Sequence, residues 1–120
     1  MNYKKWLDDF MGAWKEKDVK AVIQTISKGC EYYESVFAEP CASFEDIEKL
    51  WAVVPDNQRD IEYSYKILFQ DENICVVNFF ATRILVPSNV KQEINGIFQI
   101  SLDEKGKCEF FKQWREVKES

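Results

Sequence analysis

Residues 59–69, RDIEYSYKILF, decide the fold because apolar and polar side chains alternate along them. The odd positions are apolar or aromatic, at Ile61, Tyr63, Tyr65, Ile67 and Phe69. The even positions from Asp60 to Lys66 carry polar or charged side chains. Because successive side chains of a strand point to opposite faces of its sheet, this pattern predicts an antiparallel strand with one buried face and one face in water.

Three more strands are expected to follow in a meander. Residues 74–86, ICVVNFFATRILV, are apolar on both faces, which predicts a strand that is covered on both sides. The polar turns DEN and PSNV separate this strand from its neighbours. Two later strands are expected at residues 91–102 and 108–117, with the turn DEKGK between them. The second half of the chain therefore predicts an antiparallel sheet.

The first part of the chain has helical spacing instead. Apolar and aromatic residues recur every three or four positions over residues 2–16, which predicts an amphipathic helix with an aromatic stripe. Asp18 is expected to cap a second helix over residues 19–26, VKAVIQTI, and Lys28 and Gly29 are expected to end it. Two helices thus precede the first strand.

A short strand and a third helix complete the pattern. Residues 30–35, CEYYES, are rich in β-forming side chains and predict the strand. Ser43 and Asp46 form a Ser-x-x-Asp box that opens the third helix, whose buried side carries Trp51. Helices segregated onto one face of an antiparallel sheet predict an α+β roll, with three N-terminal helices packed on a curved, mainly antiparallel sheet.

Composition narrows the classes of function. The 46% apolar content supports one hydrophobic core, so residues 1–120 are expected to form a single domain. The net charge of −5, with Lys and Arg scattered along the chain, argues against a nucleic-acid partner and against an anionic membrane surface. No apolar run approaches the length of a membrane span, and no signal-peptide core follows the N-terminus. We therefore expect a soluble, cytoplasmic protein.

Metal and cofactor sites are not expected. The chain contains no histidine, and its four cysteines are widely spaced without a CxxC pair. Structural zinc sites usually present closely spaced Cys pairs or His partners, so we interpret the cysteines as core residues in a reducing compartment. Without histidine, a Ser-His-Asp or Cys-His catalytic arrangement cannot be built. The isolated glycines form no phosphate-binding loop.

Several motifs together resemble a known family. They are the AW before KD at the end of the first helix, the strand and loop YYESVFAEP at 32–40, the Trp-bearing third helix, and the closing pair GIFQISLDEKGKCEFFKQW at 96–114. Over nearly its whole length, the chain resembles the SnoaL-like branch of the nuclear-transport-factor-2-like superfamily. The resemblance implies a cone-shaped roll with an internal pocket between helices and sheet. It also implies a homodimer packed through the outer sheet face, but no single function.

Similarity to the ketosteroid isomerases of this superfamily makes Glu34 a candidate general base. Those enzymes place a carboxylate base at the end of the first strand, and that position falls on Glu34. The positions of their two oxyanion donors fall on Phe10 and Phe98, which cannot donate a hydrogen bond. Ketosteroid isomerase activity is therefore not expected, although Tyr32 or Tyr63 could supply a replacement donor.

The same register points Phe111, Gln113 and Arg115 into the pocket. Arg115 could pair with Glu34 and lower the pKa of its carboxylate, whereas an apolar cage would raise that pKa, and the sequence leaves both open. The candidate ligand-binding residues are Phe10, Trp14, Tyr32, Trp51, Phe98, Phe111, Gln113 and Arg115. Their aromatic members could instead simply fill the core, and Glu34 could be a surface carboxylate without chemistry.

Two functions are compatible with such a pocket. The first is a binding protein for a small, largely apolar ligand whose polar handle meets Glu34, Gln113 or Arg115. The second is an enzyme of isomerase, cyclase or hydrolase type in which Glu34 acts as a general base. The missing oxyanion donors favour the binding protein.

A homodimer is the expected assembly. Residues 74–86 are apolar on both faces, so an isolated roll would leave one of these faces exposed. Phe110 and Trp114 are predicted to point outward from the last strand, and aromatic residues are enriched in protein interfaces.

Overall fold

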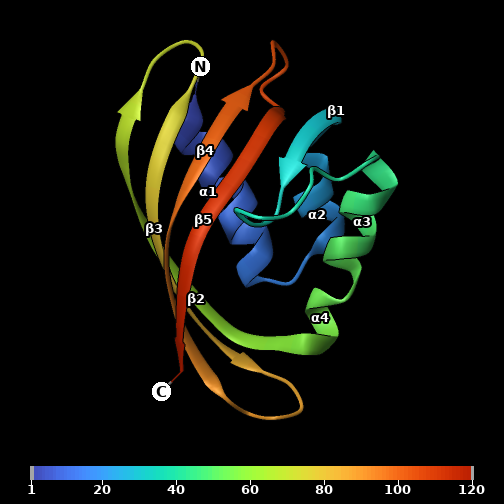
Figure 1. Ribbon diagram of the computed structural model, residues 1–120, viewed down its shortest axis with the longest axis vertical. Helices are drawn as coiled ribbons and strands as arrows, with labels where there is room; N and C mark the ends of the chain where they lie inside the picture. Colours follow the sequence, from blue (N-terminus) through green and yellow to red (C-terminus); the bar gives the residue numbers. More distant parts are fainter. Residues whose placement is uncertain (1, 120) are drawn as a thin grey trace.

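Residues 2–119 are described by the computed structural model, and they form four helices and five strands (Figure 1). The helices are α1 (Tyr3–Lys15), α2 (Val19–Gln24), α3 (Phe44–Ala52) and the short α4 (Val54–Asn57). The strands are β1 (Ile26–Tyr33), β2 (Gln58–Gln70), β3 (Cys75–Leu85), β4 (Lys91–Leu102) and β5 (Cys108–Glu119). The helices gather on one side of a curved sheet, which confirms the predicted α+β class (Figure 1).

The predicted helix caps are present. The Asp18 side chain accepts a hydrogen bond from the backbone N–H of Ala21 at 3.1 Å and begins α2. The Ser43 hydroxyl accepts one from the backbone N–H of Asp46 at 3.3 Å and begins α3. Such caps satisfy backbone donors that have no partner inside the helix. The helices therefore start where local side-chain chemistry specifies.

The five strands form one mixed sheet in the order β1-β5-β4-β3-β2. The four long strands β2 to β5 make an antiparallel meander, as the alternating pattern predicts. Strand β1 pairs in parallel with β5 at the other edge, through Tyr32 opposite Phe111 and Tyr33 opposite Lys112. The first strand of the chain therefore lies beside the last one.

The second helix is shorter than its sequence pattern predicts, and the strand after it begins earlier. Helix α2 ends at Gln24, and β1 begins at Ile26, whereas the pattern predicts a helix to Ile26 and a strand from Cys30. The reason is pairing with β5, because the Thr25 carbonyl accepts a hydrogen bond from the Cys108 N–H at 2.9 Å. Tertiary strand pairing overrides the local helical period here.

The core lies between the helices and the concave face of the sheet. Helix α1 contributes seven buried residues, at Tyr3, Trp6, Leu7, Phe10, Met11, Ala13 and Trp14. Alternate residues of β3 face them, and Val77 and Phe79 are almost fully buried. On the opposite face of the sheet, Phe80 is 46% exposed. The helices cover one face of β3, and the predicted cover of its other face stays a prediction.

Candidate functional site

A cavity of about 230 Å³ lies between the helices and the concave face of the sheet. It opens between α1, α3, the end of β1 and the inward face of β3, β4 and β5. All nine residues proposed from the sequence line it, namely Phe10, Trp14, Tyr32, Glu34, Trp51, Phe98, Phe111, Gln113 and Arg115. The structure thus brings these residues together, and their roles stay predictions.

Aromatic rings build the deep wall of the cavity. The rings of Phe79 and Phe98 stack with their centroids 4.0 Å apart, and those of Tyr32 and Phe111 stack at 4.6 Å. Phe98 and Phe111 join the two stacks at 5.0 Å. Phe10, from α1, packs against both Phe98 and Phe111. The wall is therefore continuous across four strands and one helix, and it is rigid and apolar.

Hydrogen bonds inside the wall occupy both tryptophan N–H groups of the cavity. The Trp14 Nε1–H donates to Gln58 Oε1 at 3.0 Å. The Trp51 Nε1–H donates to the Tyr32 hydroxyl oxygen at 3.2 Å. Tyr32 therefore acts as an acceptor toward Trp51, which leaves its own O–H proton available to donate.

The environment of Tyr32 keeps its hydroxyl group neutral. Burial raises the pKa of Tyr32 far above its usual range. The hydrogen bond from Trp51 lowers this pKa by less than burial raises it, and the Glu34 carboxylate adds a further, smaller rise. A neutral phenol can donate a hydrogen bond to an oxygen atom in the cavity. Tyr32 thus lines the cavity whereas Tyr63 lines a different groove, and the role of Tyr32 as a replacement donor stays a prediction.

Glu34 follows directly after the last residue of β1, Tyr33, where the chain turns away from the sheet. Its side chain lines the cavity and is partly buried. Among residues 2–119, Glu34 makes no ion pair, so the structure does not contain the considered bridge to Arg115. A carboxylate at the cavity wall without a fixed cation is free to act on a ligand.

Arg83 and Gln58 also line the cavity, and the sequence patterns did not single them out. Arg83 is partly buried in β3, and its Nε–H donates to Gln92 Oε1 at 2.9 Å. A signal was present, because Arg83 shares its strand parity with the buried residues Phe79 and Ala81. A single arginine on the buried face of a strand indicates a polar feature in the core.

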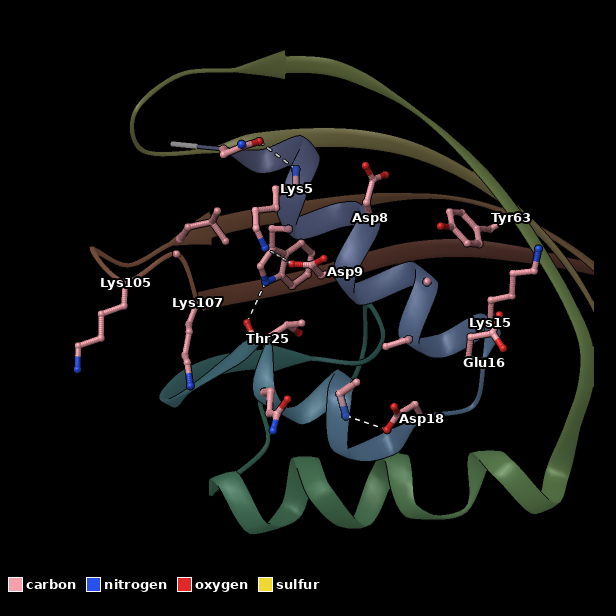
Figure 2. A pocket seen from close by; sticks show the side chains of 18 residues that line it. Lys5, Asp8, Asp9, Lys15, Glu16, Asp18, Thr25, Tyr63, Lys105 and Lys107 are labelled. Atoms are coloured by element: carbon pink, nitrogen blue, oxygen red, sulfur yellow. Dashed lines mark hydrogen bonds and ion pairs between the residues drawn. The ribbon is translucent and has the colours of Figure 1, made fainter.

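A second, larger and shallower groove runs along the outer side of α1 (Figure 2). It has a volume of about 820 Å³, and four of the eight charged side chains that line it form ion pairs with each other or with neighbouring residues. Lys5 pairs with Asp9 at 2.6 Å, and Lys15 pairs with Glu62 at 3.0 Å. Asp8 accepts hydrogen bonds from Lys4 and from the Tyr65 hydroxyl, at 2.8 and 2.6 Å. Such neutralised, exposed pairs make this groove a weak candidate for a binding site.

The described part of the chain offers neither a metal-binding cluster nor a membrane-spanning helix. Within residues 2–119, no cluster of three or more His, Cys, Asp or Glu side chains is arranged to hold a metal ion. No helix in the same range is long and apolar enough to cross a membrane. The internal cavity is therefore the candidate functional site.

The helices on a curved mixed sheet, with a cavity between them, define the NTF2-like fold, and comparison with solved structures confirms this class. The chain is similar to SalBIII, described as an epoxide hydrolase/cyclase-like enzyme in pyran ring formation in the polyether salinomycin. The TM-score is 0.78 at 17% identity, over 94% of this chain and 89% of that one. It is also similar to an NTF2-like protein from Burkholderia xenovorans LB400, with a TM-score of 0.67 and 19% identity over 94% and 88% of the two chains.

A third similar structure is an LEH-like epoxide hydrolase from M. tuberculosis. It has a TM-score of 0.72 at 13% identity, over 93% of this chain and 80% of that chain. No family model and no curated protein matches the sequence. Likeness at these identities establishes the fold, and proteins with this fold include both ligand-binding proteins and enzymes.

Proposed function

We propose that this protein binds a small, largely apolar molecule in its internal cavity. The observation that carries the proposal is the continuous aromatic wall, from Phe79 on β3 to Phe10 on α1, next to an open volume of about 230 Å³. Ligand sites are typically apolar cavities with a few oriented polar groups, and this one is at the small end of their range. A ligand of one aromatic ring and a short substituent fits this volume.

A neutral aromatic alcohol tests the proposal. Benzyl alcohol is titrated into the ¹⁵N-labelled protein, and amide shifts are followed by NMR spectroscopy. Saturable shifts are expected around the cavity. Val54 lines the cavity, and Val54→Phe is expected to reduce its volume and weaken binding. Val53→Phe is the matched control, because Val53 is 53% exposed and does not line the cavity. Equal binding by both variants, or no saturable binding by the wild type, contradicts the proposal.

A second candidate function is supported by the Glu34 carboxylate, which lines the cavity without an ion pair among the described residues. In epoxide hydrolysis, Glu34 would remove a proton from water while the water oxygen bonds to an epoxide carbon. The C–O bond of the ring would break, and its oxygen would accept a hydrogen bond and then a proton from Tyr32. The proton held by Glu34 returns to Tyr32, so water and epoxide give a diol without any other reactant.

Styrene oxide is the probe for this candidate reaction. Turnover to the diol is expected to be lost in Glu34→Gln, which keeps the shape of the side chain but cannot accept the proton. Glu39→Gln is the matched control, because Glu39 is exposed in the same loop and does not line the cavity. Benzyl alcohol binding is expected to survive in Glu34→Gln. Absence of diol formation by the wild type rejects this candidate and leaves the binding function in place.

A further inference from the structure

Two of the three arginines of this chain line the internal cavity, and they are Arg83 on β3 and Arg115 on β5. The third, Arg59, lies outside the cavity and forms an ion pair with Asp60. Neither cavity arginine has such a partner among residues 2–119. Within the described part of the chain, the arginine outside the cavity thus has a counter-ion and the two arginines inside have none.

Holding Arg83 in this position is costly. Its guanidinium is partly buried, and one N–H, at Nε, donates to Gln92, which leaves its other donors for a different partner. Burial, and then the positive charge of Arg115, lowers the pKa of Arg83. Both arginines line the same cavity. A partly desolvated cation beside a second one lowers stability unless an anion joins them.

The cavity lining carries more positive than negative side chains. Glu34 is the one other charged side chain among its described lining residues, and it lies at the end of β1. Strands β5 and β4 separate β1 from β3, so Glu34 and Arg83 come from parts of the sheet that are not neighbours. With two cations and one anion, the cavity has a net charge of +1, in a protein of net charge −5.

We propose that the cavity binds a small aromatic monocarboxylate, with the ring against the Phe79 and Phe98 stack and the carboxylate held by Arg83 and Arg115. This inference rests on the proposed binding function and names its ligand class. The planar guanidinium presents paired N–H groups that match the two oxygens of a carboxylate. The bound anion would neutralise positive charge of the Arg83 and Arg115 side chains. Tyr32 and Gln113 provide further polar groups on the same wall.

The test compares an acid with its neutral analogue of the same shape. Binding of 3-phenylpropanoate and of 3-phenylpropanamide is measured by calorimetry, with NMR shifts to locate both. The carboxylate is expected to bind about tenfold more tightly, because hydrogen bonds to charged groups are stronger than neutral ones. Arg83→Met and Arg115→Gln are each expected to weaken carboxylate binding more than amide binding, and so to remove most of this preference.

Two control variants isolate the role of position. Arg59→Gln makes the same change in net charge outside the cavity, and it is expected to leave carboxylate binding unchanged. Glu34→Gln removes the negative charge inside the cavity, and it is expected to strengthen carboxylate binding. If Arg83→Met fails to fold, two other variants still test the carboxylate site. They are Arg115→Gln, at an exposed residue, and Glu34→Gln.

The outcomes separate this inference from the function on which it rests. Equal affinity for acid and amide overturns the inference alone, as does an effect of Arg59→Gln equal to that of Arg115→Gln. Absence of binding by either compound at millimolar concentration overturns both the inference and the proposed binding function. A tenfold preference that only the cavity arginines support establishes the carboxylate site.

Discussion

Replacing Gly96 with alanine provides a sharp test of the packing beside the cavity. Gly96 lies in the middle of β4, opposite Phe79 on β3 and Arg115 on β5. A Cβ atom placed there would overlap the carbonyl oxygen of Trp114, and it would lie 2.7 Å from Phe79 Cε1 and 3.0 Å from the Cβ of Arg115. The added methyl group has no free space in any of these directions.

The cost of this substitution follows from what its neighbours can do. The Phe79 ring is stacked on Phe98 at 4.0 Å, so it cannot move away, and the Trp114 carbonyl belongs to the backbone of β5. Relief therefore requires β4 and β5 to shift. Overpacking of this kind costs about 3 kcal/mol, at the upper end of its usual range. For a domain of this size, that loss lowers the melting temperature by about 10 °C.

Gly29→Ala is the matched control for this experiment. Its added Cβ meets no atom within 4 Å, so the expected change in stability is below about 1 kcal/mol. Urea unfolding followed by circular dichroism measures both variants against the wild type. If Gly96→Ala unfolds at the same urea concentration as Gly29→Ala, the described packing between β3, β4 and β5 is wrong.

Four other predictions concern assembly, titration and the surface. We propose a homodimer through the outer sheet face, so sedimentation at micromolar concentration should give a dimer that Phe80→Glu dissociates, and a monomeric wild type would reject the interface. Burial raises the pKa of Cys75 from its ordinary 9.0 to about 11. Between these two pH values the folded state keeps a proton that the unfolded state releases, so the free energy of unfolding should fall as the pH rises from 9.0 to about 11. Cys75→Ala should flatten that slope in urea titrations, and an unchanged slope would exclude Cys75 as the cause. The hydrogen bonds from Lys4 and then from Tyr65 lower the pKa of Asp8, so Tyr65→Phe should raise it toward its ordinary value in carbonyl NMR titrations, whereas an unmoved value would mean that the Tyr65 contact is absent. Phe37 is 99% exposed, so Phe37→Ala should change stability by less than about 0.5 kcal/mol, and a larger loss would show that this side chain packs on something.

Periodicity alone predicts much of this fold. The alternation from Ile61 to Ile67 and the caps at Asp18 and Ser43 depend on neighbouring residues, and the structure contains them. The same alternation wrongly predicted Phe69 on the buried face, because the register shifts between Ile67 and Phe69 and leaves Phe69 55% exposed. The early start of β1 at Ile26 depends on pairing with β5, so no local pattern could indicate it. Elements determined by local chemistry were predicted correctly. The start of β1, which depends on a distant partner strand, was predicted four residues too late.

The candidate site divides in the same way. The register taken from the family resemblance placed Phe111 and Gln113 inward, and the alternation of β3 likewise places Arg83 inward. Arg83 was not singled out because residues 74–86 were interpreted as apolar on both faces. Pairing between Glu34 and Arg115 depends on side-chain rotamers, which no periodic pattern specifies. Sequence therefore identified the faces of the strands, and the structure identified which charged groups have partners.

The parallel pairing of β1 with β5 has a consequence for synthesis of the chain. The ribosome makes the N-terminal helices and β1 first, and the strand that completes their sheet last. Until β5 emerges, β1 has no strand to pair with, and closing so long a loop is slow. During translation we therefore expect chaperones to bind the unpaired β1 segment. A chain that lacks β5 should aggregate rather than form a smaller folded domain.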